Sequence, residues 1–234
     1  MDQFQVVSAV VKFFIVLVSS AMTAEFYRRY NDSLNRSSLF LLLFQLLFTV
    51  TYLFQFLIPI LYDPAVALLE KGSYAHSSLS GVTFTLFASF EVLLMSLFSF
   101  DVYNPKLTKY LSAVPVSVVI IYTYVYFRYG QVLRSFDGFN EWVSSPQLQL
   151  MTEILAALSF LPALVFLMYA LKMRGSEKKR GALLSSGFFI LAVFVYVLDN
   201  LAIQPPNIII RRLFILVGLL VIWSALRRRG TTVK

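Results

Sequence analysis

The stretch SLFLLLFQLLFTVTYLFQFLIPIL, residues 38–61, contains no charged residue, and it decides the fold class. A helix needs about 20 apolar residues to cross the hydrocarbon core of a bilayer, at a rise of about 1.5 Å per residue. A strand of a membrane barrel would alternate apolar and polar residues over about ten positions. Residues 39–43 are instead continuously apolar, so the stretch predicts a membrane-spanning helix.

Further apolar runs of similar length lie on both sides of this stretch. They are residues 4–26, 80–101, 109–128, 149–171, 182–200 and 208–226. Hydrophobic residues make up 59% of the 234-residue chain and charged residues only 14%, which is too much apolar surface for a soluble domain. We therefore predict one all-α domain over residues 1–234, a seven-helix bundle of an integral membrane protein.

The distribution of Lys and Arg between the runs predicts the orientation of the bundle. Fourteen of them lie in the first, third and fifth gaps and the C-terminal tail, and three lie in the other gaps. The positive-inside rule then places the N-terminus outside and the C-terminus in the cytoplasm, and we expect a cell membrane. This asymmetry accounts for most of the net charge of +8, so nucleic-acid binding is not needed to explain it.

The expected partners follow from this orientation. Basic clusters on the cytoplasmic side would contact anionic lipid headgroups, at about 1 kcal/mol per residue. Their members are Lys178, Lys179, Arg180, Arg227, Arg228 and Arg229. Small residues such as Ser20, Ala24 and Gly187 are weak indications of a membrane-protein partner or a second copy of the chain.

Two charged residues fall deep inside the predicted spans. A charge at the bilayer centre costs at least about 2.5 to 3.5 kcal/mol, so each calls for a partner or a water-filled cavity. Glu91 lies near the middle of the third span and Lys12 nearer the outer end of the first, so an ion pair is one prediction. Alternatively, Lys12 extends its long side chain outward, and a protonated Glu91 is hydrogen-bonded to a neighbouring Ser, Thr or Tyr.

A second group of charges lies nearer the outer surface, at Glu153, Asp199, Arg211 and Arg212. The short turn 204–207 makes the last two spans antiparallel neighbours, and an arginine fork suits a carboxylate. One interpretation is a structural clamp between these two helices. The other is an outward-facing polar pocket for a ligand or ion, in which Lys12 and Glu91 take part.

Polar, aromatic and proline residues add further predictions. Gln45, Thr49 and Tyr52 recur at helical spacing, so they either line the pocket or make interhelical hydrogen bonds. An aromatic belt is expected at the outer end of the fourth span, and breaks are expected at two prolines. These residues are Tyr122, Tyr124, Tyr126 and Tyr129 for the belt, and Pro115 and Pro162 for the breaks.

Catalytic signatures are absent from the sequence. The chain has no cysteine, His76 is its only histidine, and no phosphate-binding loop or nucleophile elbow occurs, so we expect no cofactor, no metal and no enzymatic activity. In architecture alone, the plan resembles the seven-helix modules at the N-terminus of some sensor kinases. Three functions remain as hypotheses: a receptor-like or regulatory subunit, a small channel or proton-coupled transporter using Glu91, and a structural subunit of a larger membrane assembly.

Overall fold

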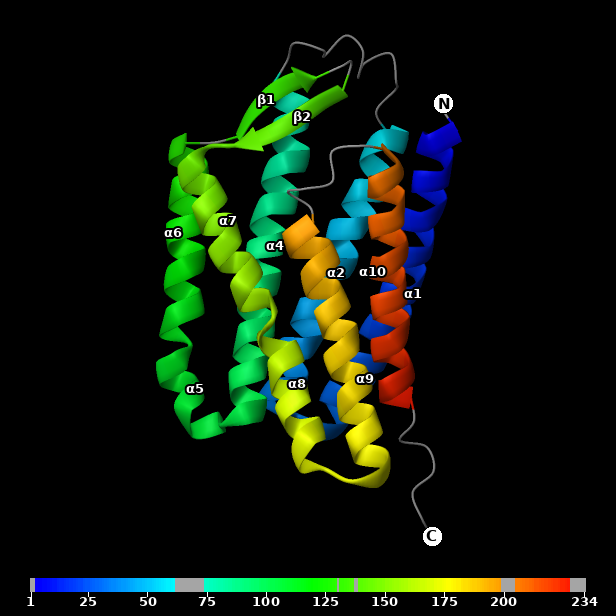
Figure 1. Cartoon of the computed structure of the whole chain (residues 1–234), viewed down its shortest axis with the longest axis vertical. Coiled ribbons are helices and arrows are strands. Elements are labelled where there is room, and N and C mark those ends of the chain that lie inside the picture. The colour runs from blue at the N-terminus through cyan, green and yellow to red at the C-terminus, as the bar shows by residue number, and fades with distance from the viewer. Residues whose placement is uncertain (1–2, 62–73, 130, 137–138, 199–204, 228–234) are drawn as a thin grey trace.

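The computed structural model describes residues 3–61, 74–129, 131–136, 139–198 and 205–227 (Figure 1). Within these ranges, seven helical spans are long and apolar enough to cross a membrane, which confirms the predicted helical membrane architecture. The uninterrupted spans are α1 (Gln3–Ser33), α2 (Arg36–Leu61), α4 (Tyr74–Tyr103) and α10 (Pro205–Arg227). The interrupted ones are α5 (Pro105–Leu111) with α6 (Ala113–Tyr129), α7 (Pro146–Ser159) with α8 (Leu161–Lys172), and α9 (Gly175–Leu191) with a π-helical segment, η1 (Ala192–Val197).

Two of the interruptions lie where the prolines predicted them. Helices α5 and α6 meet at Ser112, shortly before Pro115, and helices α7 and α8 meet at Phe160, two residues before Pro162. Proline lacks a backbone N–H, and its ring clashes with the carbonyl four residues earlier, which breaks the regular hydrogen-bond ladder. Both pairs of helices still form one membrane-length span each.

A two-stranded antiparallel hairpin replaces the loop expected between the fourth and fifth spans. Strands β1 (Gln131–Phe136) and β2 (Phe139–Ser144) pair from Gln131 opposite Ser144 to Phe136 opposite Phe139. Val, Leu, Phe and Trp in these segments favour extended backbone, and the intervening sequence Asp-Gly is typical of two-residue hairpin turns. No secondary structure was predicted for this segment between the fourth and fifth spans.

Consecutive spans pack side by side, and α10 closes the arrangement against α1 (Figure 1). Helix α2 packs between α1 and α4, and α4 also contacts α6, α7 and α8. The N-terminal end of α1 lies at the same end of the bundle as β1 and β2, which we call the hairpin end (Figure 1). The opposite end, where α8 meets α9 and where α10 finishes, carries Lys172, Lys178 and Arg227, and we call it the basic end.

Aromatic and glycine contacts hold the half of the bundle near the basic end. Phe98 on α4 packs against Phe166 on α8 and Phe188 on α9, and the last two rings are stacked with centroids 5.7 Å apart. Helices α9 and α10 approach closely at Gly187 and Gly218, where a Cβ on Gly187 would lie 2.5 Å from Cγ1 of Ile222. Gly187 therefore serves contact within the bundle, since any side chain would push the two helices apart.

Candidate functional site

The centre of the bundle holds a carboxyl group that is bonded by two hydroxyl groups from other helices. Glu91 on α4 is only 1% exposed. Its Oε1 accepts a hydrogen bond of 2.7 Å from the hydroxyl of Thr51 on α2. Its Oε2 accepts one of 2.9 Å from the hydroxyl of Tyr196 on η1. We call these three side chains the Glu91 node, and it joins three helical elements that are distant in sequence.

The backbone around the node explains how these side chains meet. Tyr196 lies in the π-helical segment, whose wider turns change the direction of side chains relative to a regular helix and often mark functional sites. Phe194 in the same segment stacks on Phe214 of α10, with ring centroids 4.4 Å apart. The segment is thereby held against α10 while Tyr196, which is 7% exposed, reaches α4.

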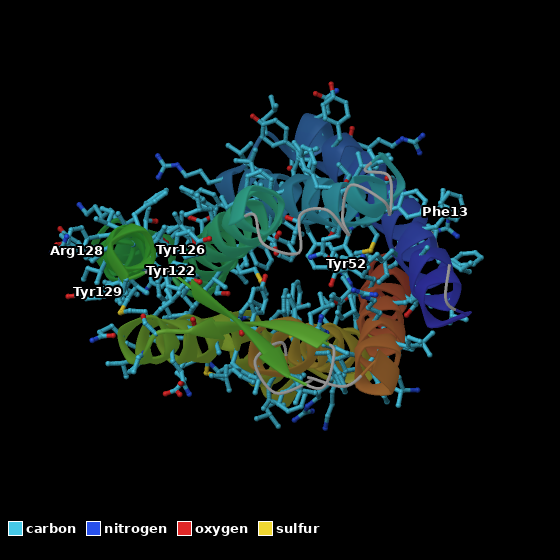
Figure 2. The ribbon with its side chains drawn as sticks, turned by 90° about the horizontal axis from the view of Figure 1, so that it is seen from above. Phe13, Tyr52, Tyr122, Tyr126, Arg128 and Tyr129 are labelled. Atoms are coloured by element: carbon cyan, nitrogen blue, oxygen red, sulfur yellow. The ribbon has the colours of Figure 1, made fainter. Side chains whose placement is uncertain are left out.

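Neutral hydroxyl groups, not cations, surround the carboxyl of Glu91. Among the described residues, Glu91 makes no ion pair, and its hydrogen-bond donors are Thr51 and Tyr196. Tyr52, the neighbour of Thr51 on α2, is 4% exposed and points into the middle of the bundle (Figure 2). The site is therefore a buried carboxyl bonded by hydroxyl groups, and a charge there would be costly.

Lys12 does not pair with Glu91. Its Nζ donates a hydrogen bond of 2.8 Å to the backbone carbonyl of Gln55, one helical turn beyond Thr51 on α2. The two charged residues are kept apart because α2 packs between α1 and α4. The alternative arrangement that the sequence suggested, a carboxyl bonded to Thr and Tyr hydroxyls, is the one present.

The structure brings together only part of the predicted outer pocket. Arg211 and Arg212 on α10 lie near enough to Lys12 for their charges to act on its ammonium group. Both arginines are partly buried and make further interactions. Glu153 is exposed on α7, where Gln149 donates to its Oε1 at 3.4 Å, and it does not join this group. Asp199 lies outside the described residues, so the clamp between it and the arginines stays a prediction.

Polar residues on α2 mostly bond to α1. The side chain of Gln45 donates to the carbonyl of Ser19 at 3.3 Å, and the hydroxyls of Thr49 and Thr23 lie 3.0 Å apart. Interhelical hydrogen bonding thus explains Gln45 and Thr49, whereas Tyr52 faces the centre.

The predicted aromatic belt is half correct. Tyr124 and Tyr129 are exposed, at 65% and 50%. Tyr122 and Tyr126 are 5% and 8% exposed and lie in the core, so for them the prediction is wrong (Figure 2). Their spacing of four residues places both on the inner face of α6, which was the signal available in the sequence.

Three of the six predicted lipid-contacting residues are exposed at the basic end, and a fourth, Arg180, is half-buried. Lys178 and Lys179 are exposed, and Arg180 lies 3.8 Å from the carboxylate of Glu177. Arg227 is exposed and stacks over the ring of Trp223 at 4.2 Å. Arg228 and Arg229 lie outside the described residues.

Arg29 was not predicted as a site residue, yet it links two helices at the basic end. Its Nη2 donates a 2.7 Å hydrogen bond to the carbonyl of Leu226, in the last turn of α10, and its Nε bonds to Glu25 at 2.9 Å. A cation at a helix C-terminus satisfies an orphan carbonyl and complements the helix dipole.

Thr51 was not among the residues predicted from the sequence. It lies about ten residues from the hairpin-side end of its predicted span, and Glu91 lies about as far from the corresponding end of the next span. This matched depth was the available signal, because adjacent antiparallel helices place such residues at one level.

No family model, no curated protein and no solved structure matches the chain. In the part of the chain that the structure describes, no group of three His, Cys, Asp or Glu side chains is placed to hold a metal ion.

Proposed function

We propose that this chain is a non-enzymatic, receptor-like or regulatory membrane protein in which the Glu91 node couples the helices. The supporting observation is that a buried carboxyl on α4 accepts hydrogen bonds from both α2 and η1. Each of these elements belongs to a membrane-length span, so a change at the node can alter packing at both ends. A signal at the hairpin end would reach the basic end through this link.

Distances between the basic ends of α4 and α9 test this proposal. Because the chain has no cysteine, Tyr103→Cys and Ser176→Cys create a unique pair for spin labels, both at exposed positions. In lipid nanodiscs, we expect Glu91→Gln and Tyr196→Phe to shift or broaden the distance distribution measured by double electron–electron resonance. Tyr124→Phe, at an exposed tyrosine, is the matched control. An unchanged distribution with a lowered melting temperature would show that the node is only structural.

The proposed orientation is N-terminus outside and C-terminus in the cytoplasm of a cell membrane. It is supported by the gathering of Lys and Arg at the basic end, according to the positive-inside rule. Single cysteines at Gln147 near the hairpin end and at Ser176 near the basic end, both exposed, test it. In intact cells, an impermeant maleimide should label the cysteine at position 147, and the one at 176 only after lysis. The reverse pattern would overturn the orientation.

We further propose that the basic end contacts anionic lipid headgroups. Exposed Lys178 and Lys179, together with Arg227 beside Trp223, support this, because Arg and Trp are suited to the membrane interface. Binding of the purified protein to vesicles is not informative for an integral protein. Co-purifying lipid is therefore measured instead, and Lys178→Gln with Lys179→Gln should lower the fraction of anionic lipid retained.

A proton-coupled carrier is the second candidate, and the buried position of Glu91 favours it. Intramembrane carboxyl groups commonly mark proton pathways. In reconstituted vesicles containing a pH-sensitive dye, this function predicts a proton flux that Glu91→Gln abolishes. Equal fluxes for the parent, the variant and protein-free vesicles would exclude it.

A further inference from the structure

The hydroxyl of Thr51 faces two acceptors but carries only one hydrogen. Its Oγ1 lies 2.7 Å from Oε1 of Glu91 and 2.9 Å from the backbone carbonyl of Leu47, one turn earlier on α2. A hydroxyl donates one hydrogen bond and can accept others. Only one of these two contacts can use the hydrogen of Thr51 at a time. If Thr51 donates to Leu47, its contact with Oε1 needs a proton on Glu91.

Each protonation state of Glu91 satisfies a different set of contacts. When Glu91 is ionised, Thr51 donates to Oε1, Tyr196 donates to Oε2, and the carbonyl of Leu47 keeps only its helical bond. When Glu91 is neutral, its own O–H donates to Oγ1 of Thr51, and Thr51 donates to Leu47. In the neutral state, the contacts Thr51–Leu47, Glu91–Thr51 and Tyr196–Glu91 are all hydrogen bonds, and no charge lies in the bundle centre.

We propose that Glu91 is a proton-binding site in which the bound proton reverses the hydrogen-bond roles of Glu91 and Thr51. On release, the proton leaves Oε1 for water, and the hydrogen of Thr51 rotates about the Cβ–Oγ bond from Leu47 to Oε1. The change of hydrogen-bond roles within the node moves no heavy atom, whereas transfer of the proton to water requires water to reach Oε1 of the buried carboxyl. The ligand is a single proton, which binds Oε1 of Glu91 and is donated to Oγ1 of Thr51, while Tyr196 remains a donor to Oε2.

Other titratable groups lie on the elements that pack against α4. Helix α2 contributes Tyr52 close to Tyr196, and α6 contributes the buried Tyr122 and Tyr126. The charged groups on the remaining neighbours of α4 are exposed: Lys106 and Lys109 on α5, Glu153 on α7 and Lys172 on α8. Among the described residues, the carboxyl of Glu91 is thus bonded only by the two hydroxyl donors of the node.

Release of the proton would leave a charged carboxylate in the buried node, at a cost in solvation free energy. A carboxylate that is 1% exposed loses its hydration, and two hydroxyl donors replace only part of it. Separation of η1 from α4 would admit water and relieve this cost. This consequence rests on the proposed receptor-like function, whereas the proton site itself does not.

Infrared difference spectroscopy of the full chain in nanodiscs tests the proton site. We titrate from acidic to alkaline pH and follow the C=O stretch of a protonated carboxylic acid. We expect a band that disappears on titration, is missing in Glu91→Gln, and shifts in frequency in Thr51→Val, which removes the hydroxyl acceptor. Thr51→Ser keeps the hydroxyl and should behave like the parent. Thr49→Val is the matched control, because Thr49 lies on the same helix but bonds to α1.

Two results would overturn the proposal. One is the absence of any Glu91-dependent band at all pH values in the folded protein. The other is a band with the same frequency in Thr51→Val and the parent, because Thr51 would then take no part in proton binding. If Thr51→Val does not fold, Thr51→Ala supplies the same comparison.

The outcome for the receptor-like function is separate. A Glu91-dependent band together with spin-label distances that do not respond to node variants would support the proton site and reject the coupling function. Spin-label distances that respond to node variants, without any Glu91-dependent band, would support the coupling function and reject the proton site.

Discussion

The hydroxyl of Tyr196 donates a 2.9 Å hydrogen bond to Oε2 of Glu91 across a sequence separation of 105 residues. Tyr196 belongs to the π-helical segment that ends the sixth span, and Glu91 lies near the middle of α4. The bond connects a helix in the first half of the sequence with a helical segment in the second half. Its contribution to stability and to coupling can be separated experimentally.

Tyr196→Phe should lower the free energy of unfolding by about 0.6 kcal/mol, and by at most about 1.7 kcal/mol, the range of interhelical hydrogen bonds in membranes. The change leaves one carboxyl oxygen of Glu91 without its donor. In a Glu91→Ala background, the same change should cost much less, because the acceptor is already gone. Reversible unfolding in mixed micelles measures all four corners of this cycle. Equal costs in both backgrounds would mean that the bond contributes nothing.

Gly187→Ala should destabilise the protein by about 1 to 3 kcal/mol through overpacking between α9 and α10. The added Cβ would lie 2.5 Å from Cγ1 of Ile222 and 3.1 Å from the carbonyl oxygen of Gly218. In an Ile222→Ala background, the cost of Gly187→Ala should fall, because the nearest atom is absent. Ser186→Ala, at the adjacent exposed position, is the control and should be neutral. A neutral Gly187→Ala would contradict the close approach of the two helices.

Arg29→Gln should destabilise the basic end by about 1 kcal/mol. The variant removes the charged donor to the carbonyl of Leu226 at the C-terminus of α10 and leaves Glu25 unpaired. Arg28→Gln removes the same charge from an exposed neighbour and is the matched control. We expect faster hydrogen exchange at the end of α10 for Arg29→Gln only. Identical exchange in the two variants would show that the effect is one of net charge.

Thr23→Cys combined with Thr49→Cys should form a disulfide between α1 and α2. The two hydroxyl oxygens lie 3.0 Å apart, and the chain has no other cysteine to compete. Mass spectrometry of peptides after mild oxidation measures the yield. Ala24→Cys with Thr49→Cys is the control pair, because Ala24 is exposed and lies about 100° away around the helix. Similar yields from both pairs would contradict the register of α1 on α2.

Prediction from sequence succeeded where local composition decides the structure. The apolar run at residues 38–61 needs a helix in lipid whatever its neighbours are, because only a helix satisfies its own backbone hydrogen bonds there. Pro162 predicted a break for an equally local reason, and the helix is interrupted at Phe160. The hairpin at β1 and β2 was missed because its strands are short and carry no sustained alternation.

Prediction of the site failed where the direction of a side chain around its helix decides the contact. Depth alone suggested that Lys12 and Glu91 could pair, but depth says nothing about which helix lies between them. Glu153 has a suitable depth for the outer pocket, yet it is exposed on α7. Tyr122 and Tyr126 belong to the core for the same reason, since they share the inner face of α6.

The sequence by itself determined that this protein is a helical bundle of membrane spans and that Glu91 lies near the middle of one of them. Hydrocarbon thickness and the backbone's need for internal hydrogen bonds allow little else. Only the tertiary structure decided what Glu91 contacts. The position of α2 between α1 and α4 keeps Lys12 away, and the π-helical turn brings Tyr196 to the carboxyl, so that Thr51 and Tyr196 are its partners.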